Sequence, residues 1–370
     1  MNILLIPTTD NIVINWEDVY KYFHEKGHKV YIITDNKLIT KNIPEEYIKL
    51  ELYVMKLHQL DKLSVFQKLV VLVYLNIYAK HILKKYAIDN VVVSNDNSLI
   101  QNVFTNIANT IGIETILHQA AGIFEKPKKI NPIQKIKNAI LKKLFNFNPT
   151  GNIGKNVNKC FLQGNKWIEY VDNKKITLVG NHYYYNLNES LKSKINSVSE
   201  LKSKYNLENK QIVTFFSQPF KELNISSVKN IDNLYSDIEK ISELISEKKD
   251  TIFIFKPHPQ EKYYKNFKIH GLILEEDVSS VLLASNITIT IYSTMAIQSK
   301  IANKSTIGFT PRYLPKEQTE QMKPVFDFSS TDINDLVKNI DNNKSEKDFT
   351  FTDVVDLSLN TKEIIYKELL

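Results

Sequence analysis

The stretch Thr251–Pro259 reads TIFIFKPHP, and a second stretch, Ile287–Thr294, reads ITITIYST. In each, a run of β-branched and aromatic residues of strand length is followed directly by polar side chains. Buried strands of parallel sheets have this composition, and ligands of such sheets collect beyond the carboxyl ends of the strands. We therefore expect these two strand ends to be adjacent and to offer an imidazole, an ammonium and two hydroxyls to one anionic ligand.

Strands and helical segments alternate in both halves of the chain. Strands are expected at residues 1–8, 28–35, 90–96, 114–119, 159–164 and 176–181, and again at 211–216, 251–256, 272–276, 287–291 and 305–310. Helices are expected at residues 16–27, 57–86, 98–112, 199–210, 231–248, 279–285, 295–303 and 362–370, with a short one around Trp167. This alternation predicts parallel sheets with right-handed crossovers.

We expect an α/β fold of two facing Rossmann-like domains with parallel sheets, which is the GT-B arrangement. The expected boundaries are residues 1–185 for an N-terminal acceptor domain and 186–350 for a C-terminal nucleotide-donor domain. Residues 351–370 are expected to form a tail whose helix packs back on the N-terminal domain.

Several function classes are disfavoured by composition. The nine glycines form neither a dinucleotide-binding GxGxxG nor a P-loop, and no DxD triplet is present to hold a metal-bridged donor. The single cysteine, Cys160, excludes an intramolecular disulfide and a cysteine-based zinc cluster. Among the 48 basic residues only Arg312 is an arginine, the residue that base-edge and bidentate phosphate recognition prefers. We therefore expect no cofactor, no metal and no specific nucleic-acid partner.

The segment from residue 126 to 155 contains eight lysines and no acidic residue. Within it, apolar residues recur at helical spacing: Ile133, Ile136, Ile140, Leu144 and Phe147. Such a basic amphipathic helix either lies on an anionic membrane leaflet or packs on the protein with its lysines outward. The first residues lack the basic and apolar regions of a signal peptide. We expect a cytoplasmic protein that can associate peripherally with the inner face of the membrane.

His258 is the first candidate for chemistry. Pro257 and Pro259 hold its backbone extended at a strand end, beside Lys256. An imidazole presented in this way can donate to a phosphate oxygen or protonate it as a nucleotide leaves, although a histidine can also simply occupy a turn. Ser293 and Thr294 stand at a strand-to-helix junction. Hydroxyls there serve either as ordinary N-caps or as part of an anion site.

The KPHP sequence followed by Ser293-Thr294 resembles the HP and S/T motifs of bacterial GT-B sialyltransferases and polysialyltransferases. It also resembles capsule-type transferases and the teichoic-acid polymerases that use CDP-linked alcohols. The likeness covers mainly residues 211–309. It implies that His258, Ser293 and Thr294 bind the phosphate of a cytidine nucleotide. Ser217 and Gln218, at the end of the strand before them, are expected to line the same pocket.

The chain departs from that pattern in its N-terminal half, where the acidic pair that would supply a base is absent. The comparable strand end carries His118, which resembles the histidine of the teichoic-acid enzymes, and Asp96 follows another strand as the second candidate base. Gln298 stands where many GT-B enzymes carry a ribose-binding glutamate. Glu276 is a further ribose candidate, and Arg312 is a candidate for binding the acceptor's carboxylate or phosphate.

These features together predict an inverting, metal-independent glycosyltransferase that uses a CMP-activated donor. The resemblance favours sialic acid or another nonulosonate as the sugar and a surface glycan, which can be lipid-linked, as the acceptor. The alternatives are a CDP-glycerol or CDP-ribitol phosphotransferase, a UDP-N-acetylglucosamine 2-epimerase, and a non-catalytic nucleotide-sugar binder.

Overall fold

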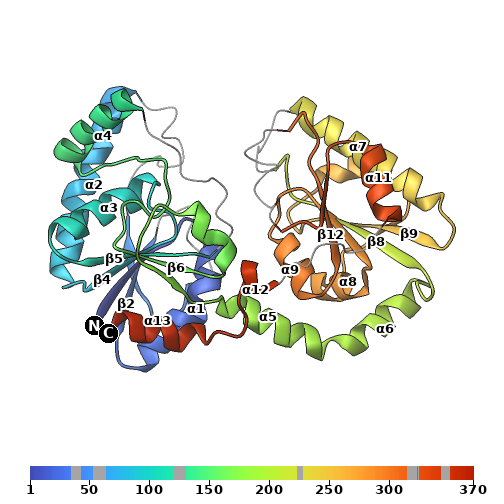
Figure 1. Ribbon diagram of the computed structural model, residues 1–370, viewed down its shortest axis with the longest axis horizontal. Coiled ribbons are helices and arrows are strands. Elements are labelled where there is room, and N and C mark those ends of the chain that lie inside the picture. The colour runs from blue at the N-terminus through green and yellow to red at the C-terminus, as the bar shows by residue number, and fades with distance from the viewer. Residues whose placement is uncertain are drawn as a thin grey trace. The chain divides into compact units, whose positions relative to one another are not determined.

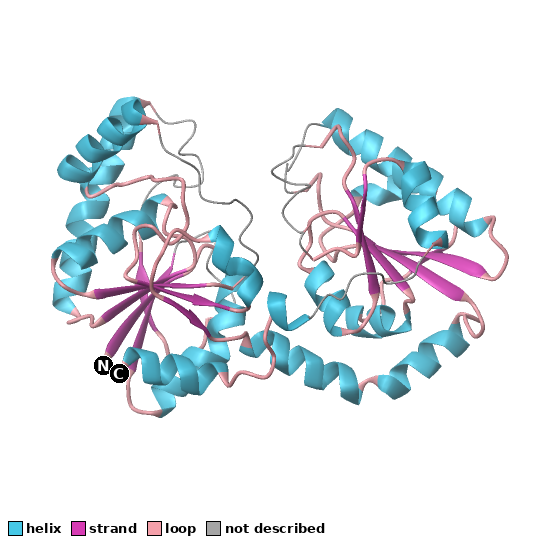
Figure 2. Ribbon diagram, in the orientation of Figure 1, coloured by secondary structure: helices cyan, strands magenta, loops and turns pink. Residues whose placement is uncertain are grey.

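The computed structural model describes residues 1–34, 43–52, 64–120, 131–222, 228–314, 323, 325–342 and 351–370. The chain divides into two compact units. The N-terminal unit comprises Met1–Tyr183 together with Val355–Leu370, and the C-terminal unit comprises Tyr184–Val354. In each unit a central sheet is covered by helices on both faces (Figures 1 and 2).

The sheet of the N-terminal unit has seven parallel strands in the order β3-β2-β1-β4-β5-β6-β7. The strand order reverses between β1 and β4, which makes their carboxyl ends the switch point at which ligands of open α/β sheets bind. The strands are β1 (Asn2–Ile6), β2 (Lys29–Thr34), β3 (Ile48–Glu51), β4 (Asn90–Val93), β5 (Glu114–His118), β6 (Lys159–Leu162) and β7 (Ile176–Leu178).

The helices of this unit are α1 (Asp10–Glu25), α2 (Val65–Lys85), α3 (Leu99–Thr110), α4 (Pro132–Phe145), the 3₁₀ helix η2 (Asn165–Tyr170) and α13 (Thr361–Leu369). The C-terminal helix α13 packs on α1, far from it in sequence. Its Ile365 and Leu369 join the core that Trp16 and Tyr20 form with β1, β2 and β5. The tail thereby contributes apolar burial to the N-terminal unit.

The sheet of the C-terminal unit has six parallel strands in the order β10-β9-β8-β11-β12-β13. This is the Rossmann strand order, with its reversal between β8 and β11. The strands are β8 (Gln211–Phe216), β9 (Thr251–Lys256), β10 (Leu272–Ile273), β11 (Ile287–Thr290), β12 (Ser305–Phe309) and β13 (Phe328–Ser330).

Two apolar layers hold this sheet in place. One packs α7 and α11 on one face through residues such as Leu234, Ile238 and Leu336, and the other packs α6 and α8 on the opposite face through Leu201 and Leu282. The helices are α5 (His182–Ser193), which begins at the boundary between the units, α6 (Ile195–Lys204), α7 (Val228–Ser246), η3 (Tyr263–Asn266), α8 (Val278–Ala284), α9 (Met295–Ile301), α11 (Ile333–Asp341) and α12 (Phe351–Val354).

The expected α/β fold with two parallel sheets is confirmed. The sequence did not predict the edge strands β3 and β13 or the helices α5 and α11. Edge strands are short and only partly buried, so their apolar pattern is weak. The expected helix over 57–86 is described from Val65, because residues 57–63 lie outside the described part of the chain. No described helix is both long and apolar enough to cross a membrane.

Candidate functional site

Three strand ends meet at the switch point of the C-terminal unit. Strand β8 pairs with β9 on one side and with β11 on the other. The expectation that the His258 and Ser293 strand ends are adjacent is therefore wrong. Because neighbouring strands lie about 5 Å apart, the ends of β9 and β11 are about 10 Å apart, with Ser217 and Gln218 of β8 between them. The intervening strand end makes β8 the centre of the candidate site.

Lys256 is the last residue of β9, and His258 follows it two residues later. Only 8% of Lys256 is exposed, and burial lowers the pKa of its ammonium despite the opposing carboxylates of Glu275, Asp277 and Glu276. The Nδ1 of His258 accepts a 3.2 Å hydrogen bond from the backbone N–H of Gln260. The neutral ring therefore carries its proton on Nε2 and can donate it to an anion. Burial, reinforced by the Lys256 charge, lowers the pKa of His258.

Glu261 connects the ends of β8 and β9 through hydrogen bonds. Its carboxylate accepts hydrogen bonds from the Ser217 hydroxyl (2.7 Å), the His258 backbone N–H (3.0 Å) and the Tyr235 hydroxyl. It is 4% exposed, and burial raises its pKa to about 7 against the effect of those three donors. One buried carboxyl group thus holds the ends of β8 and β9 in register, together with helix α7.

Among the described residues, two buried polar atoms without a hydrogen-bond partner lie just beyond the ends of β8 and β11, in addition to the Oγ1 of Thr290 within β11. They are the Oε1 of Gln218 and the hydroxyl of Tyr292, each two residues beyond the end of its strand. The Tyr292 ring packs edge-on against Phe220, with ring centroids 5.9 Å apart. Buried polar groups are nearly always satisfied in native proteins, and a bound ligand is one reason for an exception. The pair makes the carboxyl ends of β8 and β11 a candidate binding position.

Ser293 and Thr294 follow Tyr292 at the same edge. The Ser293 Oγ accepts a 3.2 Å hydrogen bond from the backbone N–H of Met295, whereas the Thr294 side chain is exposed and makes no cap hydrogen bond. The Thr294 hydroxyl is therefore not used as an ordinary N-cap. Helix α9 has only seven residues, so its N-terminus adds less to an anion site than the sequence suggested.

Three further candidate residues, Glu276, Gln298 and Arg312, have different surroundings. The carboxylate of Glu276 is engaged by Lys204 (2.7 Å) and by the Tyr205 hydroxyl (2.8 Å) of the α6 region, and the Lys204 hydrogen bond lowers its pKa. These contacts give it a structural role and leave it poorly suited to bind a ribose. Gln298 lies half-buried on α9, one turn after Thr294.

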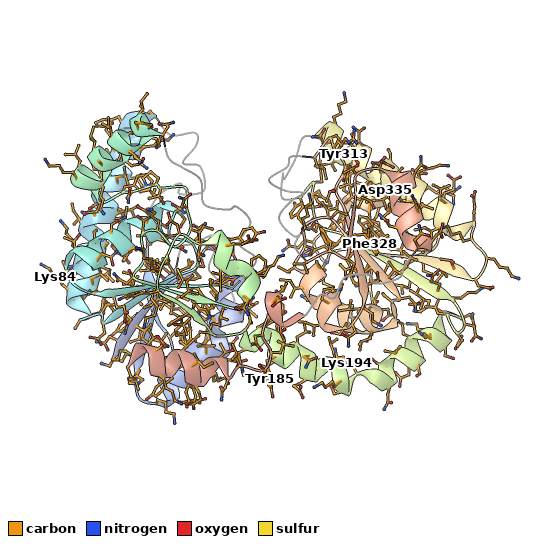
Figure 3. All side chains as sticks on the ribbon, in the orientation of Figure 1. Lys84, Tyr185, Lys194, Tyr313, Phe328 and Asp335 are labelled. Atoms are coloured by element: carbon orange, nitrogen blue, oxygen red, sulfur yellow. The ribbon has the colours of Figure 1, made fainter. Side chains whose placement is uncertain are left out.

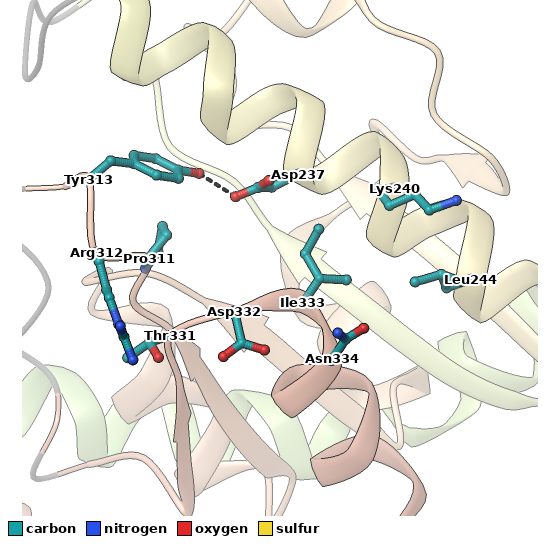
Figure 4. Close-up of a pocket in the computed structure, with 10 residues that line it drawn as sticks. All are labelled: Asp237, Lys240, Leu244, Pro311, Arg312, Tyr313, Thr331, Asp332, Ile333 and Asn334. Atoms are coloured by element: carbon teal, nitrogen blue, oxygen red, sulfur yellow. Dashed lines mark hydrogen bonds between the residues drawn. The ribbon is translucent and has the colours of Figure 1, made fainter.

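Arg312 follows β12 and lines a hollow of about 570 Å³ (Figure 4). Its neighbours there are residues of α7, of the segment after β13 and of the start of α11, including Asp332, whose carboxylate caps α11. The adjacent Tyr313 donates a 2.5 Å hydrogen bond to Asp237 and closes one side of the hollow. Arg312 is thus placed beyond β12, one strand past the switch point.

His118 lies inside the N-terminal unit. It is 3% exposed, its ring stacks on Trp16 at 5.5 Å between centroids, and its Nδ1 lies 3.1 Å from the Tyr20 hydroxyl. Burial lowers its pKa to about 3. Since a general base works best with a pKa near the working pH, this environment disfavours His118 as the base that activates an acceptor.

Asp96 is also buried, with none of its surface exposed. Its two carboxylate oxygens accept hydrogen bonds from the backbone N–H groups of Gly154 (2.9 Å) and Asn156 (2.8 Å). It therefore anchors the 151–158 loop to the end of β4, which is a structural role. Burial raises the pKa of Asp96, with those hydrogen bonds opposing the shift.

The sequence did not single out Glu261, Tyr292 or Asp10. Asp10 begins α1 just beyond β1, at the switch point of the N-terminal sheet, where Thr8 and Ser94 lie 3.3 Å apart through their hydroxyl oxygens. The polar run Thr8-Thr9-Asp10 directly after an apolar strand was the signal for it. The signal for Glu261 was its position three residues after His258.

Neither a family model nor a curated protein matches the sequence. Solved structures match over the whole chain. The UDP-GlcNAc 2-epimerase of Neisseria meningitidis bound to UDP-GlcNAc is 14% identical with a TM-score of 0.61, and the match covers 100% of this chain and 99% of that one. A glycosyltransferase from Rickettsia africae is 17% identical with a TM-score of 0.59, and 100% and 98% of the chains are covered.

The wall teichoic acid polymerase TagF, in a structure with CDPG, is 14% identical with a TM-score of 0.51, and 100% and 88% of the two chains are covered. At these identities the likeness concerns the fold. The chain has an α/β fold with two parallel sheets, like that of the GT-B epimerases and glycosyltransferases.

Proposed function

We propose that this protein is a GT-B glycosyltransferase that binds a nucleotide-activated donor at the carboxyl edge of β8, β9 and β11. The observation that carries the proposal is the pair of unpartnered buried atoms, Gln218 Oε1 and the Tyr292 hydroxyl, between the cationic end of β9 and the hydroxyls that follow β11. A nucleotide matches this set of groups, because the Tyr292 hydroxyl and the Lys256 ammonium can donate to its phosphate. The Gln218 oxygen can accept from an N–H or O–H of its nucleoside.

In this proposal the donor phosphate lies at the carboxyl edge formed by the three strand ends. His258 Nε2 and the Lys256 ammonium stabilise the negative charge that grows on the leaving phosphate as the glycosidic bond to the donor breaks. Ser293 and Thr294 donate their hydroxyls to the remaining phosphate oxygens, while Gln218 and Gln298 contact the nucleoside. Ser217 lines the same pocket, but its O–H is donated to Glu261. No metal is needed for this charge balance, because a protein cation and imidazole take its place.

The proposed donor is a cytidine nucleotide, and the resemblance of the KPHP and Ser293-Thr294 motifs favours a CMP-linked nonulosonate such as CMP-sialic acid. Transfer from a CDP-linked polyol is the neighbouring alternative. The fold similarity to TagF, whose structure contains CDPG, supports a cytidine nucleotide in either case. The proposed acceptor is a surface glycan, which can be lipid-linked.

A UDP-GlcNAc 2-epimerase is the second candidate, favoured by structural likeness to proteins of that name. Such an enzyme needs acidic side chains to move protons at carbon. At the described ends of β1, β4, β5, β6 and β7, the carboxylates within four residues of a strand are Asp10 and Asp96, and Asp96 is buried and bonded to backbone. With Asp10 as the one carboxylate suited to proton transfer there, the described strand ends favour the transferase over the epimerase.

For the base we propose Asp10 in place of His118 and Asp96. It is partly exposed, and it follows β1, the strand at the centre of its sheet. Its carboxylate also suits the N-terminus of α1, so a purely structural role is the competing explanation. The mutations discussed below separate the two roles.

The first test is thermal stabilisation by CMP, CDP, UDP and GDP, with and without EDTA. A ligand that binds only the native state at one hundred times its Kd stabilises it by about 2.7 kcal/mol. We expect a shift with CMP or CDP that persists in EDTA, followed by release of that nucleotide from the matching donor. A shift with UDP alone, together with epimerisation of UDP-GlcNAc seen by NMR, would replace the transferase with the second candidate.

A further inference from the structure

Helix α4 turns its apolar side away from the protein. Asn138 is buried in the N-terminal unit, where its side chain donates a 2.8 Å hydrogen bond to the carbonyl of Pro149. The opposite side carries four apolar residues that are exposed by 80%, 63%, 54% and 64%: Ile133, Ile136, Ile140 and Leu144. Amphipathic helices of globular proteins normally pack the apolar stripe inward. Here the stripe plays no part in the core of its own unit.

Helix α2 has a similar exposed row. It packs inward through Leu75, Ala79 and Leu83, while the row on its other side consists of Phe66 (74% exposed), Val70 (52%), Val73 (47%), Tyr74 (37%) and Ile77 (66%). The two helices pack together, and Asn146, which ends α4, donates a 2.7 Å hydrogen bond to the side chain of Asn76 on α2 (Figure 1). We call the two exposed rows together the α2–α4 face.

The charged side chains of α2 and α4 have one sign. Neither α2 nor α4 contains an aspartate or a glutamate. Of the eight exposed lysines on the two helices, Lys68, Lys135 and Lys142 lie on the sides away from the apolar rows, at 100° per residue. The three others on α2, Lys80, Lys84 and Lys85, lie along or beside its apolar row. At 100° per residue, Lys137 and Lys143 border the apolar row of α4 on its two sides. Figure 3 shows Lys84 at the outer surface of the N-terminal unit.

We propose that the α2–α4 face binds the surface of a lipid bilayer that carries anionic headgroups. The helices lie in the plane of the interface, their apolar rows enter the boundary between headgroups and acyl chains, and the lysines contact the anionic lipids. This arrangement agrees with the absence, in the described residues, of a helix able to cross a membrane. A second copy of the chain is a poorer occupant, because two such faces would bring ten lysines together, twice the five that lie along the apolar rows.

The test is cosedimentation of the full chain with vesicles of phosphatidylcholine alone and of phosphatidylcholine mixed equally with phosphatidylglycerol. We expect binding to the anionic vesicles that is more than about tenfold tighter than to the neutral ones and that weakens in high salt. The double variant Ile136→Glu/Ile140→Glu should bind the anionic vesicles at least about tenfold more weakly. Replacing Lys80, Lys84, Lys137 and Lys143, which lie along or beside the apolar rows, by glutamine should remove the preference for anionic lipid.

The matched control is Ile111→Glu, which places the same charge on an isoleucine that is 42% exposed at the end of α3 in the same unit. It should bind vesicles as the wild type does. Unchanged circular dichroism and melting would show that the double variant is folded, and its response to nucleotides is a separate readout of the C-terminal unit.

Wild-type protein that fails to bind anionic vesicles would overturn the proposal, as would equal binding by the double variant. Concentration-dependent dimerisation that the double variant abolishes, without vesicle binding, would assign the face to a second copy instead. The proposal does not depend on the nucleotide specificity, so either can fail alone.

Discussion

The hydroxyl of Ser217 donates a 2.7 Å hydrogen bond to the carboxylate of Glu261, which joins the end of β8 to the turn after β9. The same carboxylate accepts the backbone N–H of His258 at 3.0 Å. Glu261 therefore sets the position of two candidate ligand-binding residues without facing the ligand itself. The buried carboxyl group makes the geometry of this edge dependent on its protonation.

The Glu261→Gln variant should change how stability depends on pH. Burial raises the pKa of Glu261 from 4.5 to about 7, so the native state holds a proton that the unfolded chain releases in this range. The wild type should accordingly lose stability as the pH rises from 4.5 to 7, by up to about 3 kcal/mol. Denaturant titrations across this range should show a flatter profile for the variant. Parallel profiles would contradict the assignment.

The His258→Ala variant should weaken binding of CMP or CDP by about tenfold, the equivalent of one lost hydrogen bond of about 1.4 kcal/mol. The reason is that Nε2 is the free donor of a ring whose Nδ1 is already engaged. Isothermal titration calorimetry measures the change. His81→Ala, on the exposed side of α2, is the control and should bind nucleotide normally. Equal affinity of both variants would remove His258 from the site.

The Tyr292→Phe variant should keep or slightly raise the stability of the ligand-free protein, because the hydroxyl that it removes is buried and has no partner among the described residues. It should nevertheless bind nucleotide more weakly. Tyr235→Phe is the matched comparison, since its hydroxyl bonds to Glu261, and it should lower stability by about 1–3 kcal/mol. If Tyr292→Phe lost stability and kept full affinity, the switch point would not be the ligand position.

The Asp10→Asn and Asp96→Asn variants should fail in different ways. Asp10→Asn should lower turnover by about 100-fold or more, with nucleotide affinity and melting temperature retained, as expected when a general base is removed. Asp96→Asn should instead lower the free energy of unfolding by about 1–3 kcal/mol, because an amide cannot accept both backbone N–H groups that the carboxylate now accepts. Steady-state kinetics and chemical denaturation separate the outcomes. Full activity of Asp10→Asn would leave that residue as a helix-terminal charge only.

Local pattern was enough to predict the central strands and the two sheets, because a buried parallel strand needs a continuous apolar run such as TIFIF or ITITI. It was not enough for the edge strands β3 and β13, which bury little. The local pattern also placed Lys256, His258, Ser293 and Thr294 at strand ends, but it gave the wrong distance between the two strand ends. The pairing of β8 between β9 and β11 is a long-range choice that no local window contains.

The sequence by itself determined the alternating α/β pattern, the polar strand ends and the basic amphipathic character of α4, since each depends on residues close together in the chain. Tertiary structure alone decided which polar groups are available. It buried His118 against Trp16 and engaged Asp96 with backbone, while leaving the Tyr292 hydroxyl unpartnered and the apolar side of α4 exposed. Burial and hydrogen bonding are set by neighbours distant in sequence, and they determine whether a polar or apolar group holds the fold together or remains able to bind a ligand.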